Sequence, residues 1–218
     1  MPEPITIIGV SSGFLAILGH LARRNFGAAK EVVDVLLGLL LGLIALPVIV
    51  VCAIIVKLSS RGPAFFVQQR VGRDGQLFQM FKLRTMRLDA EAGTGAVWAT
   101  KGDPRIIPAC RWMRRTHLDE LPQLWNVIRG EMSVIGPRPE RLEILTDLEK
   151  VYPEVRRRLA VKPGITGLAQ VRNGYDTTVD AYRQKLAADL EYIEKRRWSM
   201  ELRILIGTMF RLNDKDSH

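Results

Sequence analysis

Two adjacent acids, Asp119 and Glu120, lie between apolar residues in a chain that is otherwise strongly basic. Neighbouring side chains project about 100° apart on a helix, so the two carboxylates reach one ligand only from different sides. Thr116 is the expected helix N-cap, and a first-turn carboxylate is then favoured as the anion by the helix dipole. An anionic carboxylate can bind Mg²⁺ or attack phosphorus. The alternative is a solvated helix start with two capping acids.

Basic residues near this pair in the sequence point to phosphate as the ligand. Lys82 and Arg84 end an apolar stretch, where a charged side chain needs a partner or a ligand. Arg138 stands between two prolines that fix its backbone. Arginine suits bidentate contacts to phosphate. Further cations in this part of the chain are Arg105, Arg111, Arg114, Arg115 and Arg141.

The overall charge agrees with anionic partners. The chain has 218 residues and a formal net charge of +9, from 32 basic and 23 acidic residues. This balance favours nucleic acid, lipid head groups or phosphorylated substrates. We expect two runs, 156–158 and 195–197, to contact lipid head groups or to aid solubility. The two cysteines and three histidines show no disulfide or metal-site spacing.

Residues 35–56 form an uncharged apolar segment of 22 residues. A straight helix of this length would measure roughly 33 Å, enough to cross a bilayer core. Pro47 lies in the middle, where it kinks a helix, and basic residues flank both ends. A re-entrant helix that bends at Pro47 and leaves by the same face explains both features, and a spanning helix is the alternative. Residues 5–22 are predicted to form an interfacial or loosely packed helix rather than a signal peptide.

The remainder has a mixed, globular composition. Alternating apolar residues predict two strands joined by a hairpin turn at 72–75. The elements that we expect are strands at 64–71 and 76–83, loops at 89–104 and 162–167, a short helical continuation at 152–159, and helices at 108–115, 118–129, 139–151, 179–196 and 199–212. The last helix is apolar on one side, which suits either a bilayer surface or a protein core.

Taken together, ordered sequence blocks over residues 30–210 resemble the bacterial sugar transferases, the monotopic phosphoglycosyl transferases. The matching blocks are Val56-Lys57-Leu58, Gly62-Pro63-Ala64-Phe65-Phe66, Gln69-Arg70-Val71-Gly72, Phe81-Lys82-Leu83-Arg84-Thr85-Met86, Asp103-Pro104-Arg105-Ile106, Leu118-Asp119-Glu120-Leu121-Pro122-Gln123-Leu124-Trp125-Asn126-Val127, Gly130-Glu131-Met132-Ser133, Gly136-Pro137-Arg138-Pro139-Glu140 and Lys162-Pro163-Gly164-Ile165-Thr166-Gly167-Leu168-Ala169-Gln170. Two departures from the family pattern are His117, where serine is common, and Ala109-Cys110.

The resemblance implies a mixed, helix-rich α/β catalytic domain with an N-terminal re-entrant membrane helix broken at Pro47 and interfacial amphipathic helices. The expected divisions are an apolar segment at 1–29, the membrane helix at 30–58 and a cytosolic domain at 59–218. The protein would be monotopic, at the cytoplasmic face of the bacterial inner membrane and in contact with its lipids. A homodimer is left open.

The resemblance also implies the chemistry. The family transfers a sugar-1-phosphate from a UDP-sugar to a polyprenyl phosphate such as undecaprenyl phosphate, in a ping-pong reaction that releases UMP. Asp119 would be the nucleophile, and Glu120 would complete the acidic pair and help to hold Mg²⁺. The expected phosphate- and substrate-binding residues are Lys82, Arg84, Arg105, Arg138 and Gln170. The alternative is a non-catalytic, membrane-tethered scaffold or regulator with the same fold, and no motif supports a nucleic-acid binder.

Overall fold

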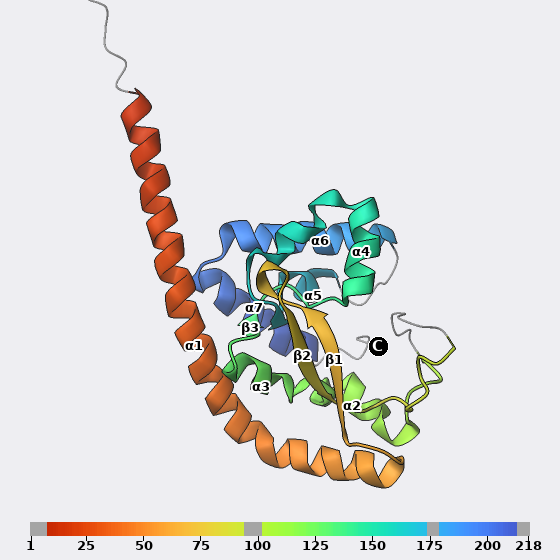
Figure 1. The fold of residues 1–218 in the computed structure, drawn as a ribbon. Helices are drawn as coiled ribbons and strands as arrows, with labels where there is room; N and C mark the ends of the chain where they lie inside the picture. Colours follow the sequence, from red (N-terminus) through yellow and green to blue (C-terminus); the bar gives the residue numbers. More distant parts are fainter. Residues whose placement is uncertain (1–7, 94–101, 174–178, 213–218) are drawn as a thin grey trace, which may run out of the picture.

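A computed structural model describes the backbone of residues 8–93, 102–173 and 179–212. Its longest element is helix α1 (Ile8–Ser59), which includes Pro47 without an interruption of the helix. Figure 1 shows α1 running along one side of the molecule and curving beneath it in its C-terminal half. The part from Phe26 to Ser59 is long and apolar enough to cross a membrane, and only 17% of its most apolar stretch is buried. A helix so exposed and so apolar is not a core helix of a water-soluble domain. The re-entrant path stays a prediction.

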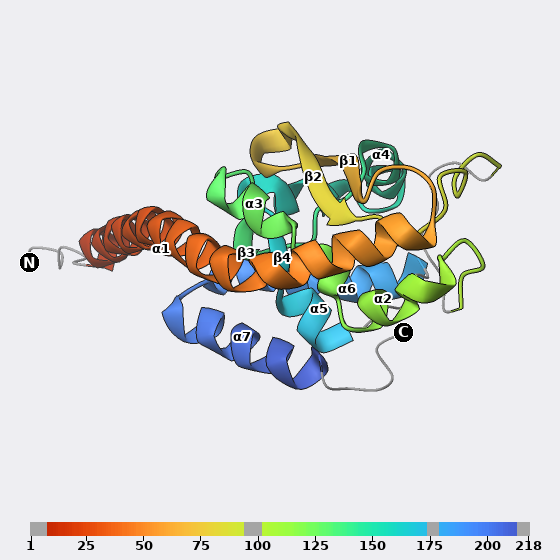
Figure 2. The same ribbon diagram turned by 90° about the horizontal axis from the view of Figure 1, so that it is seen from below.

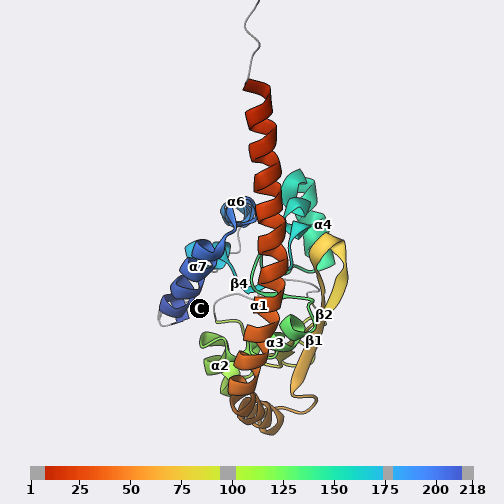
Figure 3. The ribbon, with the colours of Figure 1, turned by 90° about the vertical axis from the view of Figure 1, so that its left-hand side faces the viewer.

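Strands β1 (Phe65–Val71) and β2 (Leu77–Leu83) form the predicted antiparallel hairpin. The register pairs Phe65 with Leu83 and Val71 with Leu77. The 3₁₀ turn η1 (Arg73–Gly75) joins them, with Asp74 in the left-handed region at φ 55°. This pairing confirms the predicted hairpin, which the turn residues and the alternation in β2 had both indicated. Figure 3 shows the hairpin and α7 on opposite sides of α1.

Short helical pieces carry the acidic pair. The predicted helices at 108–115 and 118–129 are each divided, into η2 (Pro108–Cys110) with α2 (Arg111–Arg115), and η3 (Leu118–Glu120) with α3 (Gln123–Ile128). His117 causes the break before η3, because it adopts a left-handed conformation with φ 55° and ψ 17°. Helix α3 packs on α1, where a side chain at Gly38 would meet Val127. Figure 2 shows α1 crossing beneath the rest of the structure.

A second, parallel sheet pairs β3 (Ser133–Ile135) with β4 (Gly164–Thr166). The prediction of a loop over 162–167 is wrong for residues 164–166, and strands of three residues are too short to give a periodic signal in the sequence. The backbones at Gly136 and Gly164 come unusually close. A Cβ atom at Gly164 would lie 2.0 Å from the backbone nitrogen of Gly136. Only glycine fits such an approach.

The remaining helices surround these strands. They are α4 (Leu142–Val151), η4 (Pro153–Ala160), α5 (Leu168–Asn173), α6 (Val179–Lys195) and α7 (Trp198–Leu212). One apolar cluster joins β2, β3, α6 and α7, and includes the buried side chains of Met132, Tyr192 and Ile204. The prediction of a mixed, helix-rich α/β fold with a long apolar N-terminal helix is confirmed.

Buried ion pairs connect α1 to this core. The ammonium group of Lys30 lies 3.1 Å from Asp34 and 2.7 Å from Glu201 of α7. Asp34 also accepts a hydrogen bond from the backbone of Val134 at 3.2 Å. Tyr192 completes the network by donating to Glu201 at 2.7 Å. Because buried charges are costly unless paired, this network fixes how α1 meets the core.

Candidate active site

Asp119 and Glu120 both lie in the short turn η3, buried between α1, α2 and β2. Only 6% of Asp119 and 9% of Glu120 is exposed. Lys82 reaches them from the end of β2, and Arg138 reaches them from the loop that follows β3. Four of the predicted site residues therefore meet, although they are spread over more than fifty positions of the chain.

Glu120 is held between two cations. Lys82 donates to its Oε1 at 2.8 Å, while Arg138 donates to Oε1 at 2.5 Å and to Oε2 at 3.1 Å. Burial alone would raise the pKa of Glu120, but Arg138 and Lys82 outweigh burial and hold that pKa well below its ordinary value. Glu120 is thus a fixed anion at neutral pH.

Asp119 has the opposite surroundings. Among the described residues, none donates a hydrogen bond to its carboxylate or forms an ion pair with it within 4 Å. Burial, and then the neighbouring Glu120 anion, raise the pKa of Asp119 to about 6, although Lys82, Arg114 and Arg138 partly offset the rise. A largely buried carboxylate that no described donor holds is less stabilised as the anion than a fully solvated one, and this makes it a stronger nucleophile.

Titratable groups face Asp119 from several elements. They are Glu120 of η3, Lys82 of β2, Arg114 of α2, Arg138 of the loop, Cys52 of α1 and Cys110 of η2. Three of these groups are cations and one is a carboxylate beside Asp119. The site therefore has a positive balance that suits a diphosphate.

The expected N-cap was wrong. Thr116 ends α2, where its hydroxyl donates to the carbonyl of Trp112 at 2.8 Å, and so it does not cap η3. The expectation that a helix dipole would favour the Asp119 anion was also wrong, because burial raises its pKa instead. A three-residue 3₁₀ turn provides little dipole to oppose that burial.

Three other predicted residues make their described contacts elsewhere. Arg84 is buried, and its guanidinium donates to Ser60 and to the carbonyl of Pro63, both in the segment that follows α1. Arg105 pairs with Asp103 of its own loop. Gln170 lies in α5 and donates to the carbonyl of Ile165 at 3.0 Å. No described contact joins them to the acidic pair, so their phosphate-binding roles stay predictions.

The run 156–158 was only partly understood from the sequence. Arg156 and Arg157 are exposed and pair with surface glutamates, as a solubilising role requires. Arg158 has no such surface role, because its residue is only 5% exposed and its guanidinium pairs with Asp189 at 2.7 Å. Arg158 lies three positions after Val155, which is fully buried in η4, and no local pattern separates Arg158 from the two exposed arginines before it.

Asn126 is a further residue that the sequence analysis did not select. It is fully buried, and its amide donates to the carbonyl of Gln79 at 2.6 Å and to Glu131 at 2.7 Å. Its oxygen accepts from the backbone of Phe81 at 3.1 Å. Asn126 thus joins α3 to β2, and so fixes Glu120 relative to Lys82.

The acidic pair has few oxygen atoms available as metal ligands. The described residues contain no group of three or more His, Cys, Asp or Glu that could bind one. Both oxygens of Glu120 already accept from cations, whereas the Asp119 carboxylate accepts from none of the described donors. Mg²⁺ commonly takes one or two carboxylates with phosphate oxygens and water, so the site fits Mg²⁺ brought with a diphosphate better than a cage of protein ligands.

Comparison with known proteins identifies the family. The family model described as bacterial sugar transferase matches residues 25–215. The chain therefore belongs to the bacterial sugar transferase family, and it is an enzyme of the phosphoglycosyl transferase class.

Three relatives make the family likeness specific. The chain is similar to a UDP-glucose:undecaprenyl-phosphate glucose-1-phosphate transferase of Caulobacter vibrioides, with 41% identity over 195 residues, 88% of this chain and 72% of that protein. A protein with the same name from Xanthomonas campestris is 41% identical over 199 residues, 89% of this chain but 41% of the relative. A putative undecaprenyl-phosphate N-acetylgalactosaminyl 1-phosphate transferase of Bacillus subtilis is 47% identical over 132 residues, 61% of this chain and 73% of the relative.

Proposed function

We propose that this protein transfers a sugar-1-phosphate from a UDP-sugar to a polyprenyl phosphate such as undecaprenyl phosphate, and releases UMP. The observation that carries the proposal is the contrast within the acidic pair. Asp119 has a raised pKa and no described hydrogen-bond donor, while Glu120 is a fixed anion between Lys82 and Arg138. The names of the relatives support the two substrates.

In the first half-reaction, an oxygen of Asp119 attacks the phosphorus that carries the sugar. A bond forms between this oxygen and phosphorus, the bridging bond to the uridine phosphate breaks, and UMP leaves with that bond's electron pair. The product is a phosphosugar–aspartate intermediate. Arg138, whose side chain is 36% exposed, turns part of its guanidinium from Glu120 to the donor's phosphate oxygens.

In the second half-reaction, a phosphate oxygen of the polyprenyl phosphate attacks the same phosphorus. The bond to Asp119 breaks, its carboxylate is restored, and the lipid leaves as a polyprenyl diphosphosugar. Because UMP has left before the lipid reacts, one cationic site serves both steps. Lys82 and Arg138 stabilise the charge that develops on phosphorus in each.

Mg²⁺ would be held by Asp119 together with donor phosphate oxygens, and it would neutralise charge on the donor's diphosphate and on the UMP that leaves. Glu120 would join as a ligand only by giving up one of its contacts to Lys82 or Arg138.

The lipid substrate explains the apolar surface. We propose that residues 30–58 enter the cytoplasmic face of the bacterial inner membrane, bend near Pro47 and return, with 59–218 as the cytosolic domain. The exposed apolar residues of α7, among them Leu202, Met209 and Phe210, would lie at the same surface. This arrangement holds the acidic pair near the depth of the lipid head groups.

UMP release in the presence of undecaprenyl phosphate and Mg²⁺ tests the proposal. A panel of UDP-sugars that includes UDP-glucose and UDP-N-acetylgalactosamine should identify at least one donor. Asp119→Asn should release none, while Asp147→Asn, at an exposed position, should behave as wild type. If wild-type protein in membranes releases no UMP from any donor, the catalytic proposal is wrong and a scaffold is favoured.

A further inference from the structure

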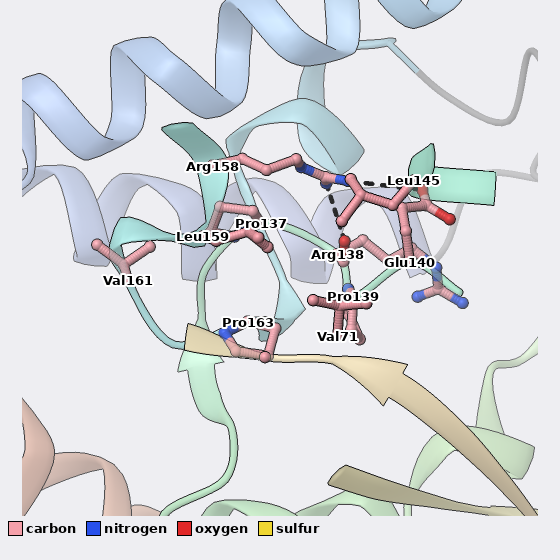
Figure 4. Close-up of a pocket in the computed structure, with 11 residues that line it drawn as sticks. Val71, Pro137, Arg138, Pro139, Glu140, Leu145, Arg158, Leu159, Val161 and Pro163 are labelled. Atoms are coloured by element: carbon pink, nitrogen blue, oxygen red, sulfur yellow. Dashed lines mark hydrogen bonds and ion pairs between the residues drawn. The ribbon is translucent and has the colours of Figure 1, made fainter. Parts of the chain in front are cut away.

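Arg158 is a buried cation that the proposed chemistry does not use. Its Nη2 donates to the backbone carbonyl of Arg138 at 2.8 Å and to Asp189 at 2.7 Å, and its Nη1 donates to the hydroxyl of Tyr182 at 2.9 Å. Figure 4 shows the Arg158 guanidinium pointing into the loop that carries Arg138. Arg158 thus touches the backbone of a residue whose side chain holds Glu120.

The loop at residues 136–140, which we call the arginine loop, is fixed at every position. Hydrogen bonds join Gly136 N to Thr166 O at 2.9 Å, Gly164 N to Pro137 O at 2.9 Å, Arg70 Nη1 to Pro139 O at 3.1 Å and Val71 N to Glu140 O at 3.0 Å. The carbonyl of Arg138, the remaining residue of the loop, accepts a hydrogen bond from Arg158. Backbone groups are commonly paired within regular structure, whereas this one depends on a distant side chain.

The positive charge of Arg158 is neutralised by an adjacent buried carboxylate, that of Asp189. Its ion pair with Asp189 is almost fully buried, with 5% and 4% of the side chains exposed. Burial lowers the pKa of Arg158, but Asp189 and other partners outweigh burial, so the guanidinium stays charged. A planar guanidinium can serve three acceptors at fixed angles, whereas a lysine ammonium at this site would not reach all of them.

We propose that Arg158 is a positioning residue for catalysis: by holding the Arg138 carbonyl, it sets where the Arg138 guanidinium meets Glu120 and the donor phosphate. This inference rests on the proposed function, in which Arg138 contacts phosphate. A single residue, Arg138, connects Arg158 to the acidic pair. Its backbone carbonyl accepts from Arg158, and its side chain donates to Glu120.

Arg158→Lys tests the proposal, with Arg157→Lys as the matched control. Arg157 is the adjacent residue, 59% exposed and paired only with the surface residue Glu194 among its described contacts. We expect Arg158→Lys to lower kcat for UMP release about 10- to 100-fold with a smaller change in KM, since small misplacements of a positioned group cost this much. Arg157→Lys should match wild type. Rates are taken well below each variant's thermal unfolding midpoint.

Two readouts separate positioning from a loss of folded protein. The rate of each variant is first divided by its folded fraction at the assay temperature, measured by circular dichroism, and kcat of Arg158→Lys should stay reduced after this division. A loss of folded molecules alone would leave kcat per folded molecule equal to that of wild type. In addition, Arg158→Lys should cost little further activity in an Arg138→Met background, because Arg158 acts on the site only through the Arg138 side chain, which this background lacks.

Additive losses of kcat per folded molecule in the double variant would overturn the proposal. If Arg158→Lys does not fold, Arg158→Met with Asp189→Leu removes the buried pair together and is tested in the same way. A crystal structure of either variant decides the point without activity: an Arg138 guanidinium still on Glu120 would refute positioning. If wild-type protein releases no UMP, the proposed function fails, and the crystal structure still tests the role of Arg158.

Discussion

Asp119 and Glu120 are joined by one peptide bond, yet their carboxyl groups have opposite electrostatic surroundings. Lys82 and Arg138 hold the pKa of Glu120 well below its ordinary value, against the effect of burial. Burial and Glu120 itself raise the pKa of Asp119 to about 6. Two titratable groups whose pKa values are pushed apart commonly have different roles in one reaction. Here one is suited to be a nucleophile and the other an anchor for cations.

The pH dependence of kcat/KM should report Asp119. Attack requires the carboxylate, so the rate should rise with pH as one proton is lost, with a midpoint at about 6. Glu120→Gln removes the neighbouring anion that raises this pKa, so its residual activity should have a midpoint at lower pH. Initial rates of UMP release from pH 4.5 to 8 check both expectations. A midpoint that moved upward in Glu120→Gln would contradict the assignment.

Asp119→Asn should stabilise the fold while it abolishes turnover. Because the pKa of Asp119 in the folded state lies above its ordinary value of 3.8, folding gains from its protonated form at low pH and loses that gain as pH rises through about 6. Asparagine carries no charge, so the variant should be more stable than wild type at pH 7.5, by on the order of 1 to 3 kcal/mol.

Thermal and denaturant unfolding at pH 7.5 and at pH 4 measure this effect. The difference between Asp119→Asn and wild type should shrink at pH 4. Asp147→Asn, at an exposed position, should change the free energy of unfolding by less than about 0.5 kcal/mol at both pH values. A less stable Asp119→Asn variant at pH 7.5 would show that the Asp119 carboxylate has partners that favour its charge.

Gly164→Ala should disrupt the parallel strand pair. A Cβ atom there would lie 2.0 Å from Gly136 N and 2.5 Å from Thr166 O, and backbone atoms cannot move aside as a side-chain end can. We expect a loss of at least about 2 kcal/mol in the free energy of unfolding, with weakened UMP release because Gly136 begins the arginine loop. Gly93→Ala is the control, since a Cβ at Gly93 meets open space. Equal stability of the two variants would contradict the close approach of β3 and β4.

Pro47→Ala should convert a re-entrant helix into a spanning one, because proline removes a backbone hydrogen bond that alanine restores. Reporter cysteines introduced as Ala28→Cys and Arg61→Cys, both at exposed positions, mark the two ends of the apolar segment. In the parent protein both should react with an impermeant reagent from the cytoplasmic side. With Pro47→Ala, Ala28→Cys should react from the opposite side. If both ends still react from the cytoplasm, Pro47 does not determine the path.

The sequence was most informative where a local pattern decides the structure. The turn at Gly72 and the alternation in β2 predicted the hairpin, and the apolar run predicted the exposed part of α1. The selection of Lys82 and Arg138 as site residues also came from the sequence, because Lys82 ends an apolar stretch, where a charge needs a partner, and Arg138 stands between two prolines that fix its backbone.

The remainder depends on tertiary contacts that leave little local signal. Strands β3 and β4 have three residues each, too few for a periodic pattern. Arg158 reads as one member of a basic run, and only its packing against Asp189 removes it from the surface. The raised pKa of Asp119 follows from burial, which no feature of residues 116–120 discloses.

Incubation of purified protein with its UDP-sugar donor, without polyprenyl phosphate, is the most direct measurement. After an acid quench, intact-protein mass spectrometry should find a population heavier by one sugar phosphate, peptide mapping should locate it on Asp119, and added polyprenyl phosphate should remove it. Asp119→Asn should stay unmodified. Protein that turns over with both substrates but carries no phosphosugar on Asp119 with donor alone would show that the transfer does not pass through that residue.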